Sequence, residues 1–369
     1  MRETEGILVT GGAGFVGSHI VEALLKRSQK VIILDLFNQE TTKSDEKQAN
    51  VSFLKRTAME VNEKLTNKYL KAELHVITGD ICNRNCIEDI INNSLYNITS
   101  VVHTAGMVDD RRSVSYPNEY FDVNIKGTAT LLDVLGKSGK IKRVIQTSTR
   151  SVFGEVENQN TKLDEFSPRR PVNPYGVSKV AADALAHCYS HMYQMQIFLI
   201  RITSCYGHRG RPDMILRILM ENIESGSVIK KFGTGEATRT WLYIDDIVDC
   251  FMKALFFGLE DTTNSDLDLL NMPPLSLYEE FNTGSKEGAV TLNQVIETAQ
   301  KVIGKKANIQ EIKEVPKGDA KFIGVLDYSK AKSVLGWEPR YDLEQGMIAL
   351  KKYYEDIKAE KKNTSNRLK

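Results

Sequence analysis

The sequence predicts an α/β fold in which a doubly wound parallel sheet carries a smaller C-terminal α/β lobe. Short apolar runs of strand length alternate with longer runs of helical apolar spacing over residues 1–203. A glycine-rich turn follows the first apolar run, and an aspartate closes the second. Strands that alternate with helices build parallel sheets, and such sheets bind ligands at the carboxyl ends of their strands.

The first strand–helix unit carries a phosphate-binding pattern. A strand is predicted over residues 6–10 and a helix over residues 15–27, and glycines with the spacing G-x-x-G-x-x-G lie at the turn between them. Small residues there let a pyrophosphate approach the backbone N–H groups at the start of the helix. The candidate cofactor-binding residues are Gly11, Gly14, Phe15, Val16 and Gly17.

Asp35 ends the second predicted strand, residues 30–34, about 20 residues beyond the glycine turn. Its carboxylate can accept both hydroxyls of a ribose there and would repel a 2′-phosphate. A lone glycine motif also arises by chance. Because strand, helix, strand and terminal acid occur in order, the stretch is typical of a Rossmann dinucleotide-binding unit, and it predicts NAD rather than NADP.

Two further predicted strands, residues 74–77 and 100–103, bring more groups to the same edge of the sheet. Asp80, with Ile81 beside it, either meets the adenine or is a solvated loop acid. The small residues after the later strand fit beneath a cofactor. The candidates that follow these strands are Asp80, Ile81, Thr104, Ala105 and Gly106.

Two polar residues in this region have a structural alternative. Asn124 interrupts the apolar face of a helix predicted over residues 119–136, where it serves either the cofactor or helix packing. His103 at a strand end is more often packed than catalytic.

Hydroxyl groups follow a fifth predicted strand, residues 143–146, in Thr147-Ser148-Thr149-Arg150-Ser151. Hydroxyls at this edge can hold a substrate oxygen while charge develops on it. Taken alone, the stretch is an ordinary Ser/Thr loop. The helix that follows it changes this interpretation.

That helix begins with Tyr175 and Lys179, which are four residues apart and therefore lie on one face. The ammonium is expected to lower the pKa of the phenol from about 10 toward the working pH. The tyrosine can then take a proton from an alcohol as hydride leaves the same carbon. Such pairs also occur on surface helices, so the glycine turn and the hydroxyls supply the context that favours catalysis.

Together, these motifs resemble the extended short-chain dehydrogenase/reductase superfamily. Residues 205–214, Cys-Tyr-Gly-His-Arg-Gly-Arg-Pro-Asp-Met, are similar to a stretch of the UDP-glucuronate 4-epimerases. Residues 239–246 resemble a pattern of nucleotide-sugar epimerases, and residues 327–331 and 335–339 resemble their C-terminal signature. The resemblance covers most of residues 6–350.

The resemblance implies NAD-dependent epimerisation at C4 of a UDP-sugar through a transient 4-keto sugar, either UDP-glucuronate to UDP-galacturonate or UDP-glucose/UDP-galactose. Tyr175 would remove the 4-hydroxyl proton, Lys179 would hold the nicotinamide ribose, and Thr149 would hydrogen-bond the reacting oxygen. The implied substrate contacts are Thr147, Ser148, Thr149, Ser204, Arg211, Arg239 and Asp327. For the two arginines, the alternative is a surface salt bridge.

Four residues depart from the family pattern and bear on which sugar is used. His208 replaces a proline, Ser204 replaces threonine or asparagine, and Thr240 follows an arginine where aspartate is usual. Arg150 is unusual beside the catalytic hydroxyl.

Other functions compete with epimerisation. A 4,6-dehydratase of this fold places an Asp-Glu pair after its threonine, and Arg150 and Ser151 occupy those positions here. A dehydrogenase or reductase of a nucleotide sugar or sterol-like alcohol fits the motifs as well. A non-catalytic NAD-binding relative commonly lacks the tyrosine or lysine, so the intact set favours an enzyme.

The predicted NAD-binding domain comprises residues 1–203 with returning segments near 241–284, and the substrate-binding lobe comprises residues 204–240 and 285–355. Residues 261–280 are predicted to be a polar insertion. The Lys-rich residues 356–369 are predicted to be a disordered tail.

Composition limits the partners and the location. Lys and Arg number 49 against 48 Asp and Glu, which predicts no nucleic-acid partner. No run approaches the roughly 18 to 20 apolar residues of a membrane span, and the polar N-terminus predicts no signal peptide. The five cysteines lack metal or disulfide spacing, so we expect a cytoplasmic enzyme without a metal. The resemblance also implies a homodimer, formed through the helices near residues 119–136 and 176–193.

Overall fold

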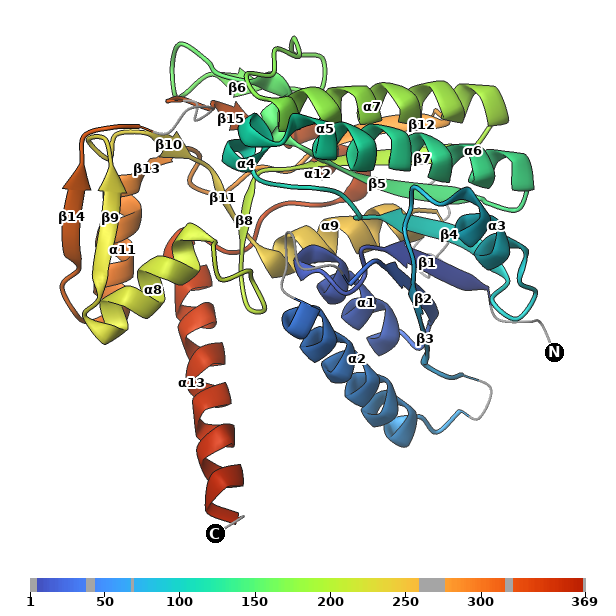
Figure 1. The fold of residues 1–369 in the computed structure, drawn as a ribbon, viewed down its shortest axis with the longest axis horizontal. Coiled ribbons are helices and arrows are strands. Elements are labelled where there is room, and N and C mark those ends of the chain that lie inside the picture. The colour runs from blue at the N-terminus through green and yellow to red at the C-terminus, as the bar shows by residue number, and fades with distance from the viewer. Residues whose placement is uncertain (1–4, 38–43, 68–69, 259–275, 316–320, 368–369) are drawn as a thin grey trace.

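The computed structural model describes residues 5–37, 44–67, 70–258, 276–315 and 321–367. A seven-stranded parallel sheet lies at its centre, in the order β12-β7-β5-β4-β1-β2-β3 (Figure 1). The strands are β1 (Gly6–Thr10), β2 (Lys30–Asp35), β3 (Glu73–Thr78), β4 (Ile98–His103), β5 (Arg143–Thr149), β7 (Gln196–Ile202) and β12 (Tyr278–Asn282). The predicted doubly wound sheet is confirmed.

The strand order reverses between β1 and β4, because the chain runs from β1 through β2 to β3 on one side and from β4 through β5 to β7 on the other. A reversal of this kind opens a crevice at the carboxyl ends of the strands, and ligands bind in it.

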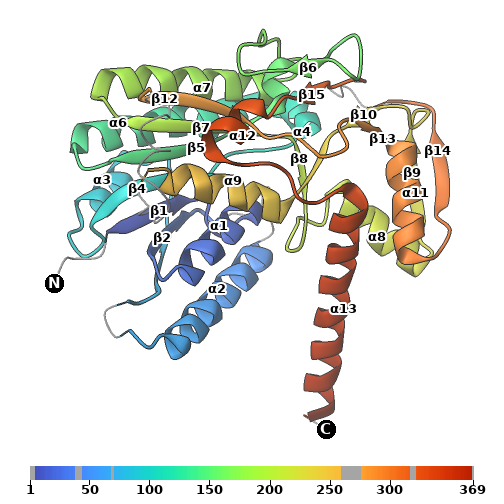
Figure 2. The same cartoon turned by 180° about the vertical axis from the view of Figure 1, so that it is seen from behind.

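Helices cover both faces of the sheet (Figures 1 and 2). Successive residues of β1 supply both cores, since Ile7 and Val9 pack on one side and Leu8 on the other. One face is covered by α1 (Phe15–Lys26), α2 (Ser44–Lys64) and α9 (Ile244–Phe256), and the other by α3 (Arg84–Asn92), α6 (Thr128–Ser138) and α7 (Pro174–Tyr193).

The helix predicted over residues 119–136 is divided. It consists of α5 (Pro117–Tyr120), a π-helical segment η1 (Phe121–Gly127) and then α6, and α4 (Asp110–Ser115) precedes it. Asn124 lies in the π-helical segment and hydrogen-bonds both backbone groups of Met107. Single π-helical turns of this type occur often beside functional sites.

Small sheets and helices from the later part of the chain lie beside the carboxyl ends of the central strands (Figure 1). They are β6 (Lys162–Leu163) with β15 (Val325–Leu326), β8 (Ser204–Tyr206) with β11 (Trp241–Tyr243), β9 (Val228–Phe232) with β14 (Asn308–Ile312), β10 (Thr238–Arg239) with β13 (Val290–Thr291), and α8 (Ile215–Ser225), α11 (Leu292–Ile303), α12 (Ser329–Leu335) and α13 (Leu343–Arg367). The assignment of these segments to a separate lobe stays a prediction.

Two segments differ from expectation. The tail predicted to be disordered instead continues α13 to Arg367, and this helix projects from the body of the molecule (Figure 1). Leu343, Met347 and Leu350 anchor its first turns in the core, and the Lys, Glu and Ala residues that follow favour helix. Of the predicted insertion, residues 261–275 lie outside the described residues, whereas residues 278–280 open β12.

Candidate active site

A cavity of about 1230 Å³ lies at the carboxyl ends of the strands and extends to the β9 and β10 segments. Its lining contains residues of β2 and β5, of the turns that follow β1 and β4, and of the start of α7, which are far apart in the sequence. The predicted site residues that line it are Gly11, Gly14, Phe15, Val16, Gly17, Asp35, Asp80, Ile81, Thr104, Ala105, Gly106, Thr147, Ser148, Thr149, Tyr175, Lys179, Ser204, Arg211 and Arg239.

The glycine turn at one end of the cavity fits a dinucleotide phosphate. Gly14 is the N-cap of α1 and gives no side-chain cap, and no acidic residue lies in the first turn. Gly11 has φ +69°, and a Cβ atom on Gly17 would lie 2.2 Å from the Gly11 carbonyl oxygen. The backbone N–H groups at this positively polarised helix end are therefore open to an anion.

Asp35 lies beside this turn and is paired with a lysine that the sequence analysis missed. Its Oδ1 atom accepts hydrogen bonds from Lys47 Nζ at 2.8 Å and from the Phe37 N–H at 3.1 Å, and Oδ2 accepts from the Ala13 N–H at 3.1 Å. Lys47 is buried and also lines the cavity. A lysine twelve residues beyond the acid, at the start of α2, is the signal in the sequence that points to this pair.

The three predicted catalytic residues lie together at the other end. Thr149 ends β5, and Tyr175 lies in the first turn of α7, where Asn173 caps the helix by accepting the Gly176 N–H at 2.8 Å. The Tyr175 hydroxyl lies near the Thr149 side chain, which opposes the rise in its pKa. Lys179 Nζ donates to the Thr147 carbonyl oxygen at 2.6 Å.

Burial dominates the protonation of this cluster. It raises the pKa of Tyr175, and the nearby Asp110 raises that pKa further, against the influence of Thr149. Burial also lowers the pKa of Lys179, and Asp183 opposes that change. The pKa of Tyr175 is therefore raised in this structure, not lowered as the sequence predicted, because burial is the largest influence on it and the Lys179 ammonium donates to the Thr147 carbonyl oxygen.

Ser148 lies between two cavity-facing threonines, but its hydroxyl does not serve the cavity. Its Oγ atom donates to Asp183 Oδ2 at 3.0 Å, and the residue is only 1% exposed. The structure thus assigns the Ser148 hydroxyl to the contact between β5 and α7, whereas the sequence analysis expected it at the substrate.

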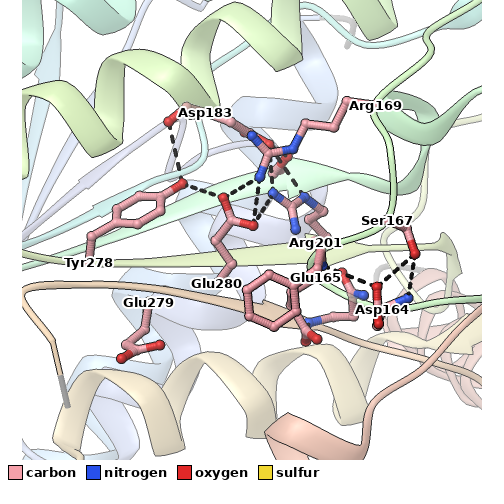
Figure 3. A network of polar contacts seen from close by, with 12 residues as sticks. Asp164, Glu165, Ser167, Arg169, Asp183, Arg201, Tyr278, Glu279 and Glu280 are labelled. Atoms are coloured by element: carbon pink, nitrogen blue, oxygen red, sulfur yellow. Dashed lines mark hydrogen bonds and ion pairs between the residues drawn. The ribbon is translucent and has the colours of Figure 1, made fainter.

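Asp183 belongs to a buried network of charges behind the catalytic strand (Figure 3). Arg201 Nη2 lies 3.3 Å from Asp183 Oδ2 and 2.7 Å from Glu280 Oε2. Glu280 also accepts hydrogen bonds from Arg169 and from the Tyr278 hydroxyl, at 2.7 Å each. Two carboxylates thus face two guanidiniums, of which Asp183 and Arg201 are fully buried and Arg169 is exposed. Two features of the sequence point to this network: Asp183 follows Lys179 by four residues, and Arg201 lies in an otherwise apolar strand.

Two predicted site residues do not line the cavity. Asn124 binds Met107 and donates to Ser178 Oγ at 2.9 Å, so it supports the loop beneath the site from behind. Asp327 Oδ1 accepts from the hydroxyl and N–H of Ser329 at the start of α12. The structure does not bring either residue together with the others.

Two histidines that the sequence analysis named do not line the cavity. His103 is packed between Thr10 and Thr128, and burial lowers its pKa to about 3. His208 stacks edge-on against His19 of α1, with ring centroids 4.4 Å apart.

Thr240 is also buried, and it hydrogen-bonds Thr203. Arg211 lines the cavity and is paired in a two-pronged contact with Asp213, at 2.9 and 3.0 Å. The sequence analysis left a substrate contact and a salt bridge as alternatives for Arg211. In the structure this residue both lines the cavity and forms a salt bridge.

A metal centre is not assembled from the described residues, since no three His, Cys, Asp or Glu side chains converge there. Within the same part of the chain, no helix is long and apolar enough to cross a membrane.

The fold and the site define a dinucleotide-binding enzyme with a tyrosine, lysine and threonine at its reactive end. Residues 7–264 match the NAD dependent epimerase/dehydratase family. The chain is 31% identical to the UDP-glucuronate 4-epimerase of Thermodesulfobacterium geofontis (strain OPF15), over 92% of this chain and 93% of that protein. It belongs to the NAD dependent epimerase/dehydratase family, and its cofactor is NAD.

Solved structures agree with this assignment. The crystal structure of UDP-glucuronic acid 4-epimerase from Bacillus cereus in complex with UDP-glucuronic acid and NAD has a TM-score of 0.77 and 29% identity, covering 95% of this chain and 99% of that one. The UDP-glucose 4-epimerase from Thermotoga maritima, solved with UDP-glucose, has a TM-score of 0.74 and 26% identity, with the same coverage.

The Asp35–Lys47 pair generates a prediction about cofactor choice. We expect Asp35→Ala to weaken NAD binding about 10-fold or more, because a charged hydrogen-bond acceptor at the ribose is lost. NADP binding should stay the same or improve, since the released Lys47 ammonium can pair with the 2′-phosphate. Fluorescence titration of the NAD-stripped protein measures both affinities. Lys47→Met is the matched variant and should keep the preference for NAD; an equal loss of NAD and NADP affinity in Asp35→Ala would contradict this account.

The buried network generates a prediction about stability. Asp183→Asn should lower the free energy of unfolding by about 3 to 5 kcal/mol, because it leaves Arg201 without one of its two buried partners. Urea unfolding followed by circular dichroism measures the change. Lys332→Met, which breaks the exposed Lys332–Glu338 pair, is the control and should have no measurable effect. Equal stability of Asp183→Asn and wild type would show that the network does not hold these elements together.

Proposed function

We propose that this protein is a NAD-dependent UDP-sugar 4-epimerase and that UDP-glucuronate and UDP-galacturonate are its substrate pair. The observation that carries the proposal is the meeting of Thr149, Tyr175 and Lys179 at one end of a cavity whose other end holds the glycine turn and Asp35. The UDP-glucuronate 4-epimerases among the similar proteins support this choice of sugar.

Tyr175 is the proton carrier in this proposal. Its hydroxyl, which lies near Thr149, takes the proton of the sugar 4-hydroxyl and later returns it to the same oxygen. NAD, held by the glycine turn and Asp35, would supply a hydride acceptor and donor for C4, and a transfer in both directions would leave no net oxidation. Thr149 hydrogen-bonds the reacting oxygen throughout and stabilises the charge that develops on it.

Lys179 has two tasks. Its ammonium, held now by the Thr147 carbonyl oxygen, is placed to hold the nicotinamide ribose. Its charge also favours the phenolate of Tyr175 when that proton is transferred. Because burial alone raises the pKa of this tyrosine, positive charge near the phenol is needed for proton transfer at neutral pH.

The dehydratase alternative is not supported by the cavity. Arg150 and Ser151 line it at the positions where a dehydratase of this fold would carry its Asp-Glu pair. Neither side chain can supply the acid and base that loss of water requires, because a guanidinium stays protonated and a serine hydroxyl is a weak acid.

The homodimer expected from the sequence forms part of the proposal. An apolar row runs along the solvent side of α7, from Val177, which is 44% exposed, to Met192, which is 60% exposed, with Ala184 and Cys188 between them. Residues at this spacing share one helix face, and an exposed apolar row of this length suits a helix–helix interface with a second copy. The five free cysteines agree with the expected cytoplasmic location.

The interface is tested with a charge placed in the middle of the row. Cys188→Glu should convert a dimer into a monomer, because each partner would bury a carboxylate. Light scattering coupled to size exclusion, at micromolar protein, gives the mass. Cys82→Glu is the control for a new carboxylate at a cysteine that lies outside α7. A monomeric wild type would overturn the dimer and leave the reaction untouched.

The reaction is tested with Tyr175→Phe. Turnover of UDP-glucuronate should fall by about 10² to 10⁴ while NAD remains bound, because only the proton carrier is lost. Chromatography of the UDP-sugars measures the product, and absorbance at 340 nm reports any net NADH. Tyr120→Phe is the matched control for the loss of a nearby phenol hydroxyl, since that ring lies 6.2 Å from the Tyr175 ring and its hydroxyl donates to the backbone oxygens of Val108 and Asp109. NADH that accumulates in step with product would instead indicate a dehydrogenase.

A further inference from the structure

Arg150 occupies a position that the reaction described so far does not use. It follows Thr149 directly and opens η2 (Arg150–Phe153), and it lines the same cavity although only 8% of its surface is exposed. Its Nη2 atom donates to the Gly154 carbonyl oxygen. Its Nε atom is buried and has no hydrogen-bond partner in the described part of the chain. The guanidinium is thus held in the wall while part of its donor capacity is unused.

The charge of Arg150 lacks a carboxylate in contact. Burial lowers its pKa to about 10, so it remains a cation at neutral pH. Asp110 is the nearby acid, but no ion pair joins the two residues in the described structure, and Asp110 Oδ1 has no hydrogen-bond partner either. Arg239 adds a second positive charge close by. A buried cation without a carboxylate in contact destabilises the protein, so an anion in the cavity is favoured there.

The loop that carries Asp110 is held in a strained conformation. Asp109, the residue before Asp110, has φ +104°, a backbone conformation that residues other than glycine rarely adopt. Its Oδ1 atom accepts the N–H groups of Arg111 and Arg112 and so caps α4, and Tyr120 donates to its carbonyl oxygen. Strained backbone held by several contacts is common at ligand sites.

The position of Arg150 beside Thr149 indicates which anion of the substrate it would bind. The proposed reaction places the C4 oxygen against Thr149 and Tyr175, and Arg150 is the next residue in the same cavity wall. We therefore expect its guanidinium beside a substituent on a carbon next to C4. In a UDP-hexuronate these neighbours carry a neutral C3 hydroxyl and the C5 carboxylate, while the diphosphate is attached at C1 across the ring. Only the carboxylate is charged, and a guanidinium can donate two parallel hydrogen bonds to it.

We propose that Arg150 binds the C5 carboxylate of the substrate and makes the enzyme selective for UDP-hexuronates over UDP-hexoses. This inference rests on the proposed function, because it assumes that a UDP-sugar lies with C4 against Thr149. In this proposal a charged side chain binds the carboxylate. The Ser148 hydroxyl, which the sequence analysis expected at the substrate, donates to Asp183 instead.

Binding and turnover of three ligands test the inference. In Arg150→Met, kcat/KM for UDP-glucuronate should fall at least about 100-fold and its Kd should rise comparably, as when one partner of a buried charge pair is removed. The Kd of UDP alone should change less than about 3-fold, and any turnover of UDP-glucose should not fall. Arg150→Lys should be intermediate, since it keeps the charge and loses the planar fork.

Controls separate a folding defect from a lost contact. Arg84→Met removes an arginine on α3 that pairs with Asp133 at the surface, and it should behave as wild type. Unchanged UDP and NAD binding in Arg150→Met shows an intact fold. If that variant is unstable, the ratio of UDP-glucuronate to UDP affinity in Arg150→Lys provides the same test.

The outcomes that overturn the inference differ from those that overturn the reaction. If Arg150→Met binds and converts UDP-glucuronate within about 5-fold of wild type, Arg150 does not bind the carboxylate. The proposed epimerase reaction is unaffected by that result. An equal loss of UDP and UDP-glucuronate affinity would assign Arg150 to the diphosphate instead. A wild type that converts no UDP-sugar overturns the proposed function, and the binding comparison still decides the role of Arg150.

Discussion

The Asp183 carboxylate joins the two elements on which the active site depends. It accepts the Ser148 hydroxyl from β5 and contacts Arg201 of β7, and it lies one turn beyond Lys179 on α7. Carboxylates are seldom buried without compensation, since the loss of hydration is large. Here the compensation comes from Arg201 and, through Glu280, from the edge strand β12 (Figure 3). The catalytic helix is thereby fixed against the catalytic strand.

A second contact fixes the same pair of elements from the cavity side. Lys179 donates to the Thr147 carbonyl oxygen, two residues before the Thr149 hydroxyl that meets Tyr175. The strand therefore contributes backbone and side chain to the catalytic group. Small rotations of α7 would break several of these contacts at once, which explains why a reactive tyrosine can be held in place by so few residues.

The two ends of the cavity recognise charge by different means. At the glycine turn, backbone N–H groups and a helix end provide a diffuse positive potential that suits phosphate and needs no side chain. At the reactive end the positive groups are side chains, the Lys179 ammonium and several guanidiniums, of which Arg211 is paired with Asp213 and Arg150 has unused donors. Recognition by side chains is more easily altered by substitution, so we propose that selectivity among sugars is determined at this end.

Features that depend on local spacing could be predicted from the sequence alone. The alternation of strands and helices, the glycine turn, Asp35 at a strand end and the Tyr175–Lys179 pair all follow from fixed periodicities, and the structure has each of them. A residue's face on a helix or its place at a strand end is decided by its near neighbours in the chain.

Features that depend on remote neighbours were decided only by the tertiary structure. The Lys47 partner of Asp35, the orientation of Ser148 toward Asp183 and the distance of Asp327 from the cavity involve segments far apart in the sequence. The protonation of Tyr175 belongs here too, because burial, which no local pattern encodes, outweighs the lysine one turn away. Spacing determined which side chains could meet, and packing determined which of them did.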